Sequence, residues 1–452
     1  MSNNIIEEKN KKKQQKIVSF FTLGCKTNQY ETDALMDLFY NNRYEIAEFD
    51  DFANIYVINT CTVTNVGDKK SRQMIRRAKK NNPDATVVVV GCYAQISPDE
   101  VAEIEDVDIV IGTDARSGIL EYIHDYQNNE TPRPYIVVKD IMAINAFEEM
   151  SVKHIKEHTR AFIKIQEGCN QFCSYCIIPY ARGRVRSRAP ENIIGEIENL
   201  VEQGYREFVL TGIHIGSYGL DFDRYKLIDL IEAIEAVEGV VRIRLGSIEP
   251  RLIDEDFVRR LKALNKVCDH FHLSMQSGSD TVLKRMNRKY TSEEYYRAVC
   301  ALREIYPAPA ITTDVIVGFP DETDREFEET YDFVEKVNFS EIHVFKFSKR
   351  QGTPAAKMEN QVSGELKKLR SERLIALGEQ LTEKYNQSYM GKTLEVLIEE
   401  FKEGFWVGHT TNYMKVKFPG NLQEKLAKKI VSVHVEQLLG QELIGSQIAS
   451  ND

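Results

Sequence analysis

Residues 161–176 read AFIKIQEGCNQFCSYC, a strand-like run that ends at a tight loop with three cysteines. Cys169, Cys173 and Cys176 follow a C-x3-C-x2-C spacing, so one short loop offers three thiolates. Three thiolates can hold three irons of a four-iron cubane cluster and leave the fourth iron without a protein ligand. Such an open metal position lets a substrate bind, as catalysis requires. A structural zinc knot with a distant fourth ligand is the alternative interpretation.

The chain after this loop alternates strand-like and helix-like segments, a pattern that is typical of a parallel α/β sheet. Amphipathic helical stretches such as 192–203 and 326–337 separate the strand candidates. Six β/α units predict an open, partial (β/α)6 barrel. The strand candidates are 161–165, 207–210, 241–245, 270–275, 311–317 and 341–347.

Three apolar runs in the first third of the chain each end at a cysteine. Helix-like stretches follow them, so a second parallel sheet is expected, with these cysteines beyond the carboxyl ends of its strands, where such sheets bind ligands. Three more thiolates there indicate a second cluster with an open iron, although free cysteines are often small buried hydrophobic residues. Two clusters that can each bind an exogenous group suit sulfur insertion. The runs 17–23, 55–59 and 87–90 end at Cys25, Cys61 and Cys92, and the helix candidates are 31–40, 69–80 and 98–104.

The last part of the chain changes character near Gly391. A long amphipathic helix is expected over 364–388, and the short alternating strands that follow are typical of a small antiparallel β-barrel. The stretch 126–158 is expected to be a linker. The expected domains are a parallel α/β domain at 16–128, the open barrel at 155–386, and the small β-barrel at 388–451 with strand candidates 394–399, 406–409, 414–418 and 430–434.

Composition places the chain among ordinary folded proteins. Its 452 residues, 42% apolar and 28% charged, exceed one domain and exclude the disordered, fibrous and membrane classes. A formal charge of −10 argues against a protein that coats nucleic acid, so RNA contacts must use local basic patches. No apolar window approaches a membrane span, and the polar, lysine-rich residues 1–16 do not resemble a signal peptide. We therefore expect a cytoplasmic protein with no membrane partner.

The loop at 168–176 resembles the cluster loop of the radical S-adenosylmethionine (SAM) superfamily. The resemblance implies that the open iron chelates the amino and carboxylate groups of SAM. It places Tyr175 near the adenine, although a buried tyrosine without that role is compatible with the same pattern. It also implies that the backbone at Thr211 and Gly212 reaches SAM and that the segment beginning at Asp314 abuts the adenine. Further pocket candidates, polar and at or beyond strand ends, are Glu249, Ser274, Gln276 and Arg288.

Further segments resemble the methylthiotransferase family over nearly the whole chain. Within that family, the form LGCKTNQYET at 23–32 is similar to the MtaB branch, which modifies N6-threonylcarbamoyladenosine next to the tRNA anticodon. The branch that modifies isopentenyladenosine has a different run at this position. The segments that carry the resemblance are 21–32 (FTLGCKTNQYET), 59–64 (NTCTVT), 70–73 (KSRQ), 91–95 (GCYAQ), Ile178-Pro179, Arg182-Gly183, Arg186-Ser187-Arg188, 276–279 (QSGS) and 283–286 (LKRM).

The resemblance implies an enzyme that uses two SAM molecules and two 4Fe-4S clusters to methylthiolate C2 of this nucleoside. One SAM supplies a methyl group to sulfur at the amino-terminal cluster, and the other is cleaved reductively at the barrel cluster to a radical that removes hydrogen from the base. The partners it implies are tRNA and an electron donor of the flavodoxin or ferredoxin type. Another tRNA adenosine or a protein aspartate as substrate, and a non-catalytic metal and RNA-binding protein, stay open as alternatives. No catalytic side chain beyond the cluster ligands is assigned.

Two features of the sequence could contact tRNA. Four arginines alternate directly after the cluster loop, so an extended segment would aim them at phosphates from one side, although a solvated charge run has the same pattern. The terminal β-barrel resembles the TRAM domain, which binds tRNA through basic and aromatic residues, although the aromatic residues could equally form its core. The candidate RNA-binding residues are Arg182, Arg184, Arg186, Arg188, Lys415 and Lys417.

Overall fold

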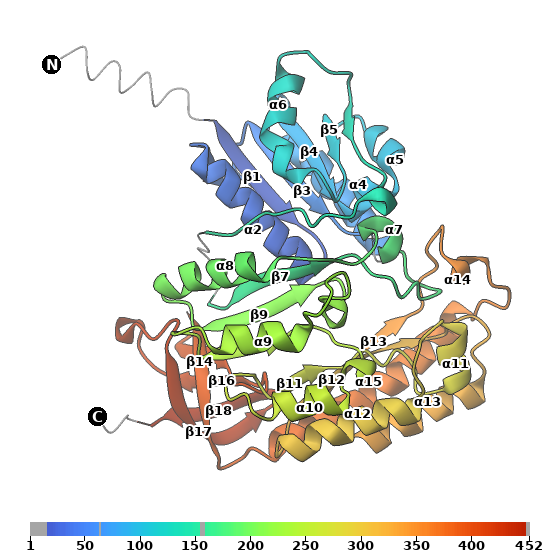
Figure 1. The fold of residues 1–452 in the computed structure, drawn as a ribbon, viewed down its shortest axis with the longest axis vertical. Helices are drawn as coiled ribbons and strands as arrows, with labels where there is room; N and C mark the ends of the chain where they lie inside the picture. Colours follow the sequence, from blue (N-terminus) through green and yellow to red (C-terminus); the bar gives the residue numbers. More distant parts are fainter. Residues whose placement is uncertain (1–15, 63–64, 154–158, 449–452) are drawn as a thin grey trace. The chain divides into compact units, whose positions relative to one another are not determined.

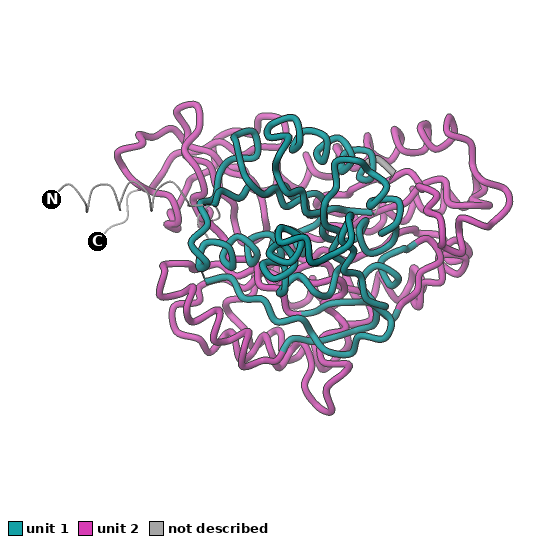
Figure 2. The backbone as a smooth tube through the Cα atoms, turned by 90° about the horizontal axis from the view of Figure 1, so that it is seen from above, with its two compact units in different colours: residues 1–155, 166–170, 176–188 teal, residues 156–165, 171–175, 189–452 magenta. Residues whose placement is uncertain are grey.

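The computed structural model describes residues 16–62, 65–153 and 159–448 (Figure 1). The chain forms two compact units (Figure 2). The predicted cluster loop stands where the chain passes from one unit to the other, so its residues are divided between them. Unit 1 consists of residues 1–155, 166–170 and 176–188, and unit 2 consists of residues 156–165, 171–175 and 189–452.

Unit 1 contains a six-stranded, fully parallel sheet in the order β2-β1-β3-β4-β5-β6. Every residue of β3 and β4 is buried, as expected for central strands that helices cover on both faces. The predicted amino-terminal sheet is confirmed. The strands are β1 Ile17–Thr22, β2 Glu45–Ala47, β3 Ile55–Thr60, β4 Thr86–Gly91, β5 Ile109–Ile111 and β6 Tyr135–Val137.

Two apolar cores lie on opposite faces of this sheet, because successive residues of β3 point to opposite sides. Val57 packs in one core with Phe39 of α2, and Ile58 packs in the other with Ile75 of α3. The linker prediction was wrong for β6, which pairs with β5 and closes the sheet at that edge. The helices of this part are α2 Lys26–Asn41, α3 Asn65–Asn81, α4 Cys92–Ile96, α5 Pro98–Ala102, α6 Ile119–Gln127, and the 3-10 turns η1 Arg116–Gly118 and η2 Ile141–Ala143.

The predicted open barrel of unit 2 is confirmed as two parallel sheets joined by single-residue bridges. Strands β7, β9 and β10 form one sheet, and β11, β12 and β13 form the other. Bridges between Ile243 and Val267 and between Ile248 and Leu273 connect them. The strands are β7 Ala161–Glu167, β9 Glu207–Gly212, β10 Arg242–Leu245, β11 His270–His272, β12 Ala310–Val317 and β13 Glu341–Lys346. The short β8 (Arg186–Ser187) pairs antiparallel with the end of β7, within unit 1.

Helices of unit 2 follow the strands in alternation, and several begin at clear sequence signals. Thr291 and Thr323 cap α12 and α13, and in each case a glutamate three residues later completes a capping box. The helices are α8 Pro190–Glu202, α9 Leu227–Glu235, α10 Glu255–Leu261, α11 Asp280–Arg285, α12 Ser292–Ile305, α13 Asp324–Val337, α14 Pro354–Lys357 and α15 Gly364–Gln387, with 3-10 turns η3 Ile215–Ser217 and η4 Pro250–Leu252.

The chain ends in a closed five-stranded barrel with the order β14-β15-β16-β18-β17. Trp406 is 2% exposed and fills its core with Val416 and Phe418. The predicted small β-barrel is confirmed, and its last strand, which was not predicted, pairs with both β16 and β17. The elements are β14 Thr393–Lys402, β15 Phe405–His409, β16 Lys415–Pro419, η5 Leu422–Glu424, β17 Ile430–Leu439 and β18 Glu442–Gln447.

Candidate functional site

Three cysteines, Cys25, Cys61 and Cys92, lie at the carboxyl ends of neighbouring strands of the six-stranded sheet. Cys25 is the N-cap residue of α2, Cys61 follows β3, and Cys92 is the first residue of α4. Strands β1, β3 and β4 are adjacent and parallel, so these ends share one edge of the sheet. A Cβ atom added to Gly24, whose φ is +110°, would lie only 3.0 Å from Cβ of Cys61. The fold thus brings three cysteines from distant motifs to one place.

A buried arginine contacts the most buried of these cysteines. Arg182 is the last residue of α7 (Ile178–Arg182), and its Nε donates a hydrogen bond to Sγ of Cys92 at 3.1 Å. Burial raises the pKa of the Cys92 thiol to about 12, and the guanidinium opposes this rise. A guanidinium beside gathered sulfur atoms would offset the negative charge of a thiolate-bound cluster. The residues present therefore fit a three-cysteine iron–sulfur cluster.

Arg182 also belongs to a buried network of charged side chains in unit 1. Its guanidinium donates to both carboxylate oxygens of Glu31, and its NH1 group lies 3.2 Å from Glu167. Arg116 binds Glu31 from another side at 2.5 Å and Glu148 at 2.8 Å. Opposite charges in contact offset much of the cost of removing each from water. The acidic members were not among the predicted site residues, although Glu31 lies inside the motif at 21–32.

The arginines that follow the cluster loop do not form the exposed row that their alternation predicted. Arg182, Arg186 and Arg188 are at most 2% exposed. Arg186 donates to the carbonyl oxygen of Arg182, and Arg188 binds Glu149 at 2.9 Å. The prediction that these three grip RNA phosphates was wrong, because the segment begins as a helix and its side chains bind protein groups. Among the four, Arg184 alone is exposed.

The predicted cluster loop at 168–176 is tightly bounded. Gly168 has a φ of +73°, and a Cβ atom there would lie 1.8 Å from the carbonyl oxygen of Arg184, so only glycine fits. Further along, the backbone N–H of Ser174 donates to the carbonyl oxygen of Met286 at 3.0 Å, within unit 2. Close backbone packing before and after the first cysteine restrains the path of the loop.

Arg288 links one cysteine of the loop to a buried carboxylate in unit 2. Its NH1 group donates to Sγ of Cys173 at 3.3 Å, and its NH2 group lies 3.0 Å from Oε1 of Glu249. Gln171 donates to the other oxygen of Glu249 at 3.1 Å, and Nε2 of His214 lies 3.6 Å from it. Burial would raise the pKa of Glu249, but His214 and Arg288 outweigh burial and lower it. Two predicted pocket residues therefore form an ionised pair beside the loop.

Four other predicted pocket residues lie at strand ends on unit 2. Thr211 and Gly212 are the last two residues of β9. Ser274 and Gln276 follow β11, and the carbonyl oxygen of Ser274 accepts a hydrogen bond from Arg288 at 3.4 Å. The carboxyl ends of β9 and β11 thus carry the polar groups that the sequence placed there.

The last two predicted SAM contacts lie in other surroundings. Tyr175 is partly buried and packs on an apolar cluster that contains Phe319 and Phe347. Asp314 is inside β12 and lies 3.3 Å from Nε2 of His272 on β11, so the structure groups it with a histidine and not with Glu249.

Three family profiles match successive parts of the chain. Residues 17–112 match the "Uncharacterized protein family UPF0004", residues 163–334 match the "Radical SAM superfamily", and residues 387–448 match the "TRAM domain". The first contains Cys25, Cys61 and Cys92, and the second contains the C-x3-C-x2-C loop.

Similar proteins extend over almost the whole chain. The threonylcarbamoyladenosine tRNA methylthiotransferase MtaB of Bacillus subtilis (strain 168) is 50% identical over 424 residues, and the match covers 92% of this chain and 93% of that protein. The chain belongs to the MtaB-type tRNA methylthiotransferase family. The MtaB protein of Aquifex aeolicus (strain VF5) is 40% identical over 403 residues, 89% of this chain and 97% of that protein. The resemblance drawn from the motifs is confirmed.

Solved structures agree with the fold of this methylthiotransferase. The radical S-adenosylmethionine methyltransferase TsrM from Kitasatospora setae, with cobalamin and a [4Fe-4S] cluster bound, has a TM-score of 0.58 at 16% identity. The match covers 76% of this chain and 74% of that one. At this identity the likeness concerns the fold alone. As a radical SAM enzyme that acts on tRNA, the chain uses SAM and a four-iron cluster. Across the described ranges, no helix is long and apolar enough to cross a bilayer.

The two predicted RNA-binding lysines of the methylthiotransferase TRAM domain share one acidic partner. Lys415 and Lys417 on β16 lie 2.6 Å and 2.7 Å from the carboxylate of Glu442 on β18. Hydrogen bonds from the two lysines lower the pKa of Glu442 to about 2. Both ammonium groups thus stand together on this face, with part of their charge already neutralised.

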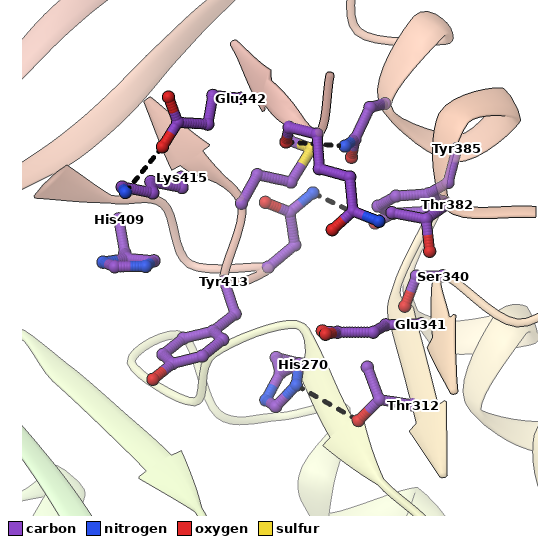
Figure 3. Close-up of a pocket in the computed structure, with 14 residues that line it drawn as sticks. His270, Thr312, Ser340, Glu341, Thr382, Tyr385, His409, Tyr413, Lys415 and Glu442 are labelled. Carbon is purple, nitrogen blue, oxygen red and sulfur yellow. Dashed lines mark hydrogen bonds and ion pairs between the residues drawn. The ribbon is translucent and has the colours of Figure 1, made fainter. Parts of the chain in front are cut away.

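A pocket of about 310 Å³ lies where the TRAM barrel meets the open barrel, both within unit 2 (Figure 3). Tyr413 borders it between two histidine rings, with centroids 4.8 Å from His409 and 5.1 Å from His270. The guanidinium of Arg244 lies 4.8 Å from the Tyr413 ring and donates to the carbonyl oxygen of Thr410. This TRAM aromatic therefore helps to join the two barrels.

Proposed function

We propose that this enzyme inserts a methylthio group at C2 of N6-threonylcarbamoyladenosine next to the tRNA anticodon. The observation that carries the proposal is the 50% identity with the Bacillus subtilis MtaB protein along 92% of this chain. Because less than a tenth of the chain is left out, the alignment must reach into the regions of all three family profiles, so the similarity covers more than the cluster loops.

We further propose that Cys169, Cys173 and Cys176 hold the cluster of the barrel. The chemistry available there with the cluster bound is one-electron reduction of SAM. Arg288 donates to the sulfur of Cys173 and binds Glu249, so this pair would orient the loop and present ionised groups toward SAM. The groups expected to bind SAM are Thr211, Gly212, Ser274 and Gln276 at the strand ends, with Tyr175 in the loop itself.

A second cluster in unit 1 is part of the same proposal. Cys25, Cys61 and Cys92 would hold it, and Arg182 would offset its charge from within the protein. Three protein thiolates leave one iron open, which would give the sulfur to be inserted a place to bind. An electron donor of the flavodoxin or ferredoxin type is required by the reductive chemistry. Arg184, Lys415 and Lys417 are the exposed or partly exposed basic side chains that we propose as tRNA contacts.

Nucleoside analysis of cellular tRNA tests the proposal directly. The chain is expressed in a bacterial strain without its own enzyme for this step, and digested tRNA is examined by liquid chromatography and mass spectrometry. We expect 2-methylthio-N6-threonylcarbamoyladenosine with the wild type and none with Cys173→Ala. Cys300→Ala is the matched control, because Cys300 lies on α12 outside all cluster motifs.

Other products would replace the proposal with a specific alternative. A 2-methylthio derivative of isopentenyladenosine in its place would assign the chain another tRNA adenosine. Unmodified tRNA together with a methylthiolated aspartate in a protein would assign it a protein substrate.

A further inference from the structure

Three polar side chains from adjacent strands of the open barrel converge on one point. They are His272 of β11, Asp314 of β12 and His343 of β13. One imidazole nitrogen of each histidine and one carboxylate oxygen of Asp314 lie within 4.8 Å of one another. Nε2 of His272 is 3.3 Å from Oδ2 of Asp314, and the two imidazole rings are stacked with centroids 6.1 Å apart. The Nδ1 atom of His272 is 3.0 Å from the hydroxyl of Thr312, which orients this ring.

This cluster lies on the face of the sheet that helices do not cover. On the covered face, Phe271 contacts the ring of Tyr306 at the end of α12, and Ile342 packs against Gly378 of α15. Strand side chains alternate between faces, so His272 and His343 point to the opposite, inner face of the barrel. Asp314 shares that face, because it contacts His272 directly.

The inner face is open at this point. The side chain of His272 is 14% exposed, that of Asp314 is 31% exposed, and that of His343 is 47% exposed. Phe345, two residues after His343 on the same face of β13, is 49% exposed although it is large and apolar. An exposed aromatic ring is a surface on which a nucleobase can stack. His343 and Phe345 therefore place a polar group and a stacking group on the same face of β13. At 3.3 Å per residue, they are about 6.6 Å apart along the strand.

We propose that His272, Asp314 and His343 bind the polar side chain on N6 of the substrate nucleoside while Phe345 stacks on its base. This inference rests on the proposed function, because it concerns how that substrate is recognised. A threonylcarbamoyl group has a carboxylate that accepts hydrogen bonds and a hydroxyl and N–H groups that donate them. Imidazole N–H groups can donate to that carboxylate, and Asp314 can accept from the hydroxyl or an N–H.

Complementarity of this kind selects against an apolar substituent. An isopentenyl group would cover the same cluster without satisfying any of its donors or acceptors. A site that is built to hydrogen-bond a substrate rejects an analogue that lacks those groups, because its own polar atoms lose water and gain no partner. The cluster thus supplies a physical basis for selecting one modified adenosine over another.

The test combines a change in the protein with a change in the substrate. Anticodon stem-loop RNAs carry N6-threonylcarbamoyladenosine or the same group with its carboxylate converted to a neutral amide. Dissociation constants and methylthio product formation are measured for the reconstituted wild type and for His343→Gln. We expect each single change to weaken RNA binding about tenfold, since a hydrogen bond to a charged group is involved. The two changes together should weaken RNA binding little more than either change alone, because they remove the same contact.

His124→Gln is the matched control, since His124 is a well-exposed histidine on α6. It should leave both RNAs unaffected. The amide RNA tests the wild-type protein, so the inference stays testable even if His343→Gln folds poorly. Formation of 5′-deoxyadenosine without RNA checks that the barrel of the variant still binds SAM.

The outcomes separate this inference from the proposed function. If the wild type forms no methylthio product on the threonylcarbamoyl RNA, the proposed function fails. If the wild type forms the product, the inference alone can still fail. It fails if His343→Gln and the amide do not weaken RNA binding, or if their effects on the binding free energy add fully. A stoichiometric divalent metal other than iron in the wild type, absent from His343→Gln, would instead assign these three residues to a metal site and overturn the inference.

Discussion

Nε of Arg182 donates a hydrogen bond to the sulfur of Cys92 at 3.1 Å. The Arg182 side chain is fully buried. Arg182 is six residues after the last cysteine of the barrel loop, and Cys92 belongs to the trio Cys25, Cys61 and Cys92 at the edge of the six-stranded sheet. Hydrogen bonds to cluster sulfurs raise reduction potentials and orient ligands. The segment after one cysteine motif therefore supplies a supporting group to the other motif.

Replacing Arg182 should destabilise unit 1. In Arg182→Gln, Glu31 keeps only one of its two guanidinium partners in a buried site, and breaking such a pair costs about 3 kcal/mol. We expect the free energy of unfolding in urea, measured on the protein without clusters, to fall by that amount. Arg184→Gln, an exposed neighbour, is the control and should stay within about 0.5 kcal/mol of the wild type. Equal stability of the two variants would contradict the burial of Arg182.

Replacing Cys25, Cys61 and Cys92 together with alanine should separate the two halves of the reaction. Two four-iron clusters hold about eight irons, so the triple variant should retain about four after anaerobic reconstitution. It should still form 5′-deoxyadenosine from SAM and reductant, because Cys173 and Arg288 are unchanged. It should form no methylthio nucleoside, since no second iron site binds sulfur. Methylthiolated tRNA from this variant would refute the two-cluster proposal.

Replacing Glu442 should strengthen tRNA binding. Glu442→Gln removes the carboxylate that Lys415 and Lys417 share, so both ammonium groups become available to phosphates. We expect a smaller Kd for tRNA. The plot of log Kd against log salt concentration should also be steeper, by the amount that about one to two additional phosphate contacts produce. Glu436→Gln makes the same charge change elsewhere on this barrel and should have a smaller effect. Indistinguishable slopes for the two variants would mean that these lysines do not bind RNA.

The capping glutamate of α13 should make stability depend on pH. Burial would raise the pKa of Glu326, but hydrogen bonds from Arg285, Thr281 and Thr323 outweigh burial and lower it to about 2. Because this pKa is below the ordinary value of 4.5, the carboxylate stabilises the fold above about pH 4.5. That contribution is lost as the pH falls from about 4.5 toward 2.

Urea unfolding of Glu326→Gln at two pH values measures this contribution. Glu326→Gln should be about 2 kcal/mol less stable than the wild type at pH 7, and the difference should shrink at pH 3. Glu304→Gln, at the exposed end of α12, should change stability little at either pH. A difference for Glu326→Gln that does not depend on pH would exclude the ionised carboxylate as its source.

The elements and motifs that are continuous along the chain were predictable from the sequence. Each of three such segments can be recognised from its own residues alone. They are the C-x3-C-x2-C loop, the buried strand 86–91 and the long helix 364–387. Apolar periodicity and cysteine spacing are local properties, so no distant residue is needed to interpret them. The three-residue strands β2, β5 and β6 and the last strand β18 were not predicted, because none of them has an apolar run long enough to stand out.

Only the tertiary structure decided which charged side chains face protein and which face solvent. Alternation predicted an exposed row of arginines, yet Arg182 meets Glu31 from 151 residues away and Arg188 meets Glu149 from 39 residues away. The tertiary structure also grouped Asp314 with His272 and His343, because neighbouring strands of a sheet come from separate parts of the chain. A charged side chain is buried only where an opposite charge offsets its loss of hydration, and that partner is chosen by the fold and not by the neighbouring sequence.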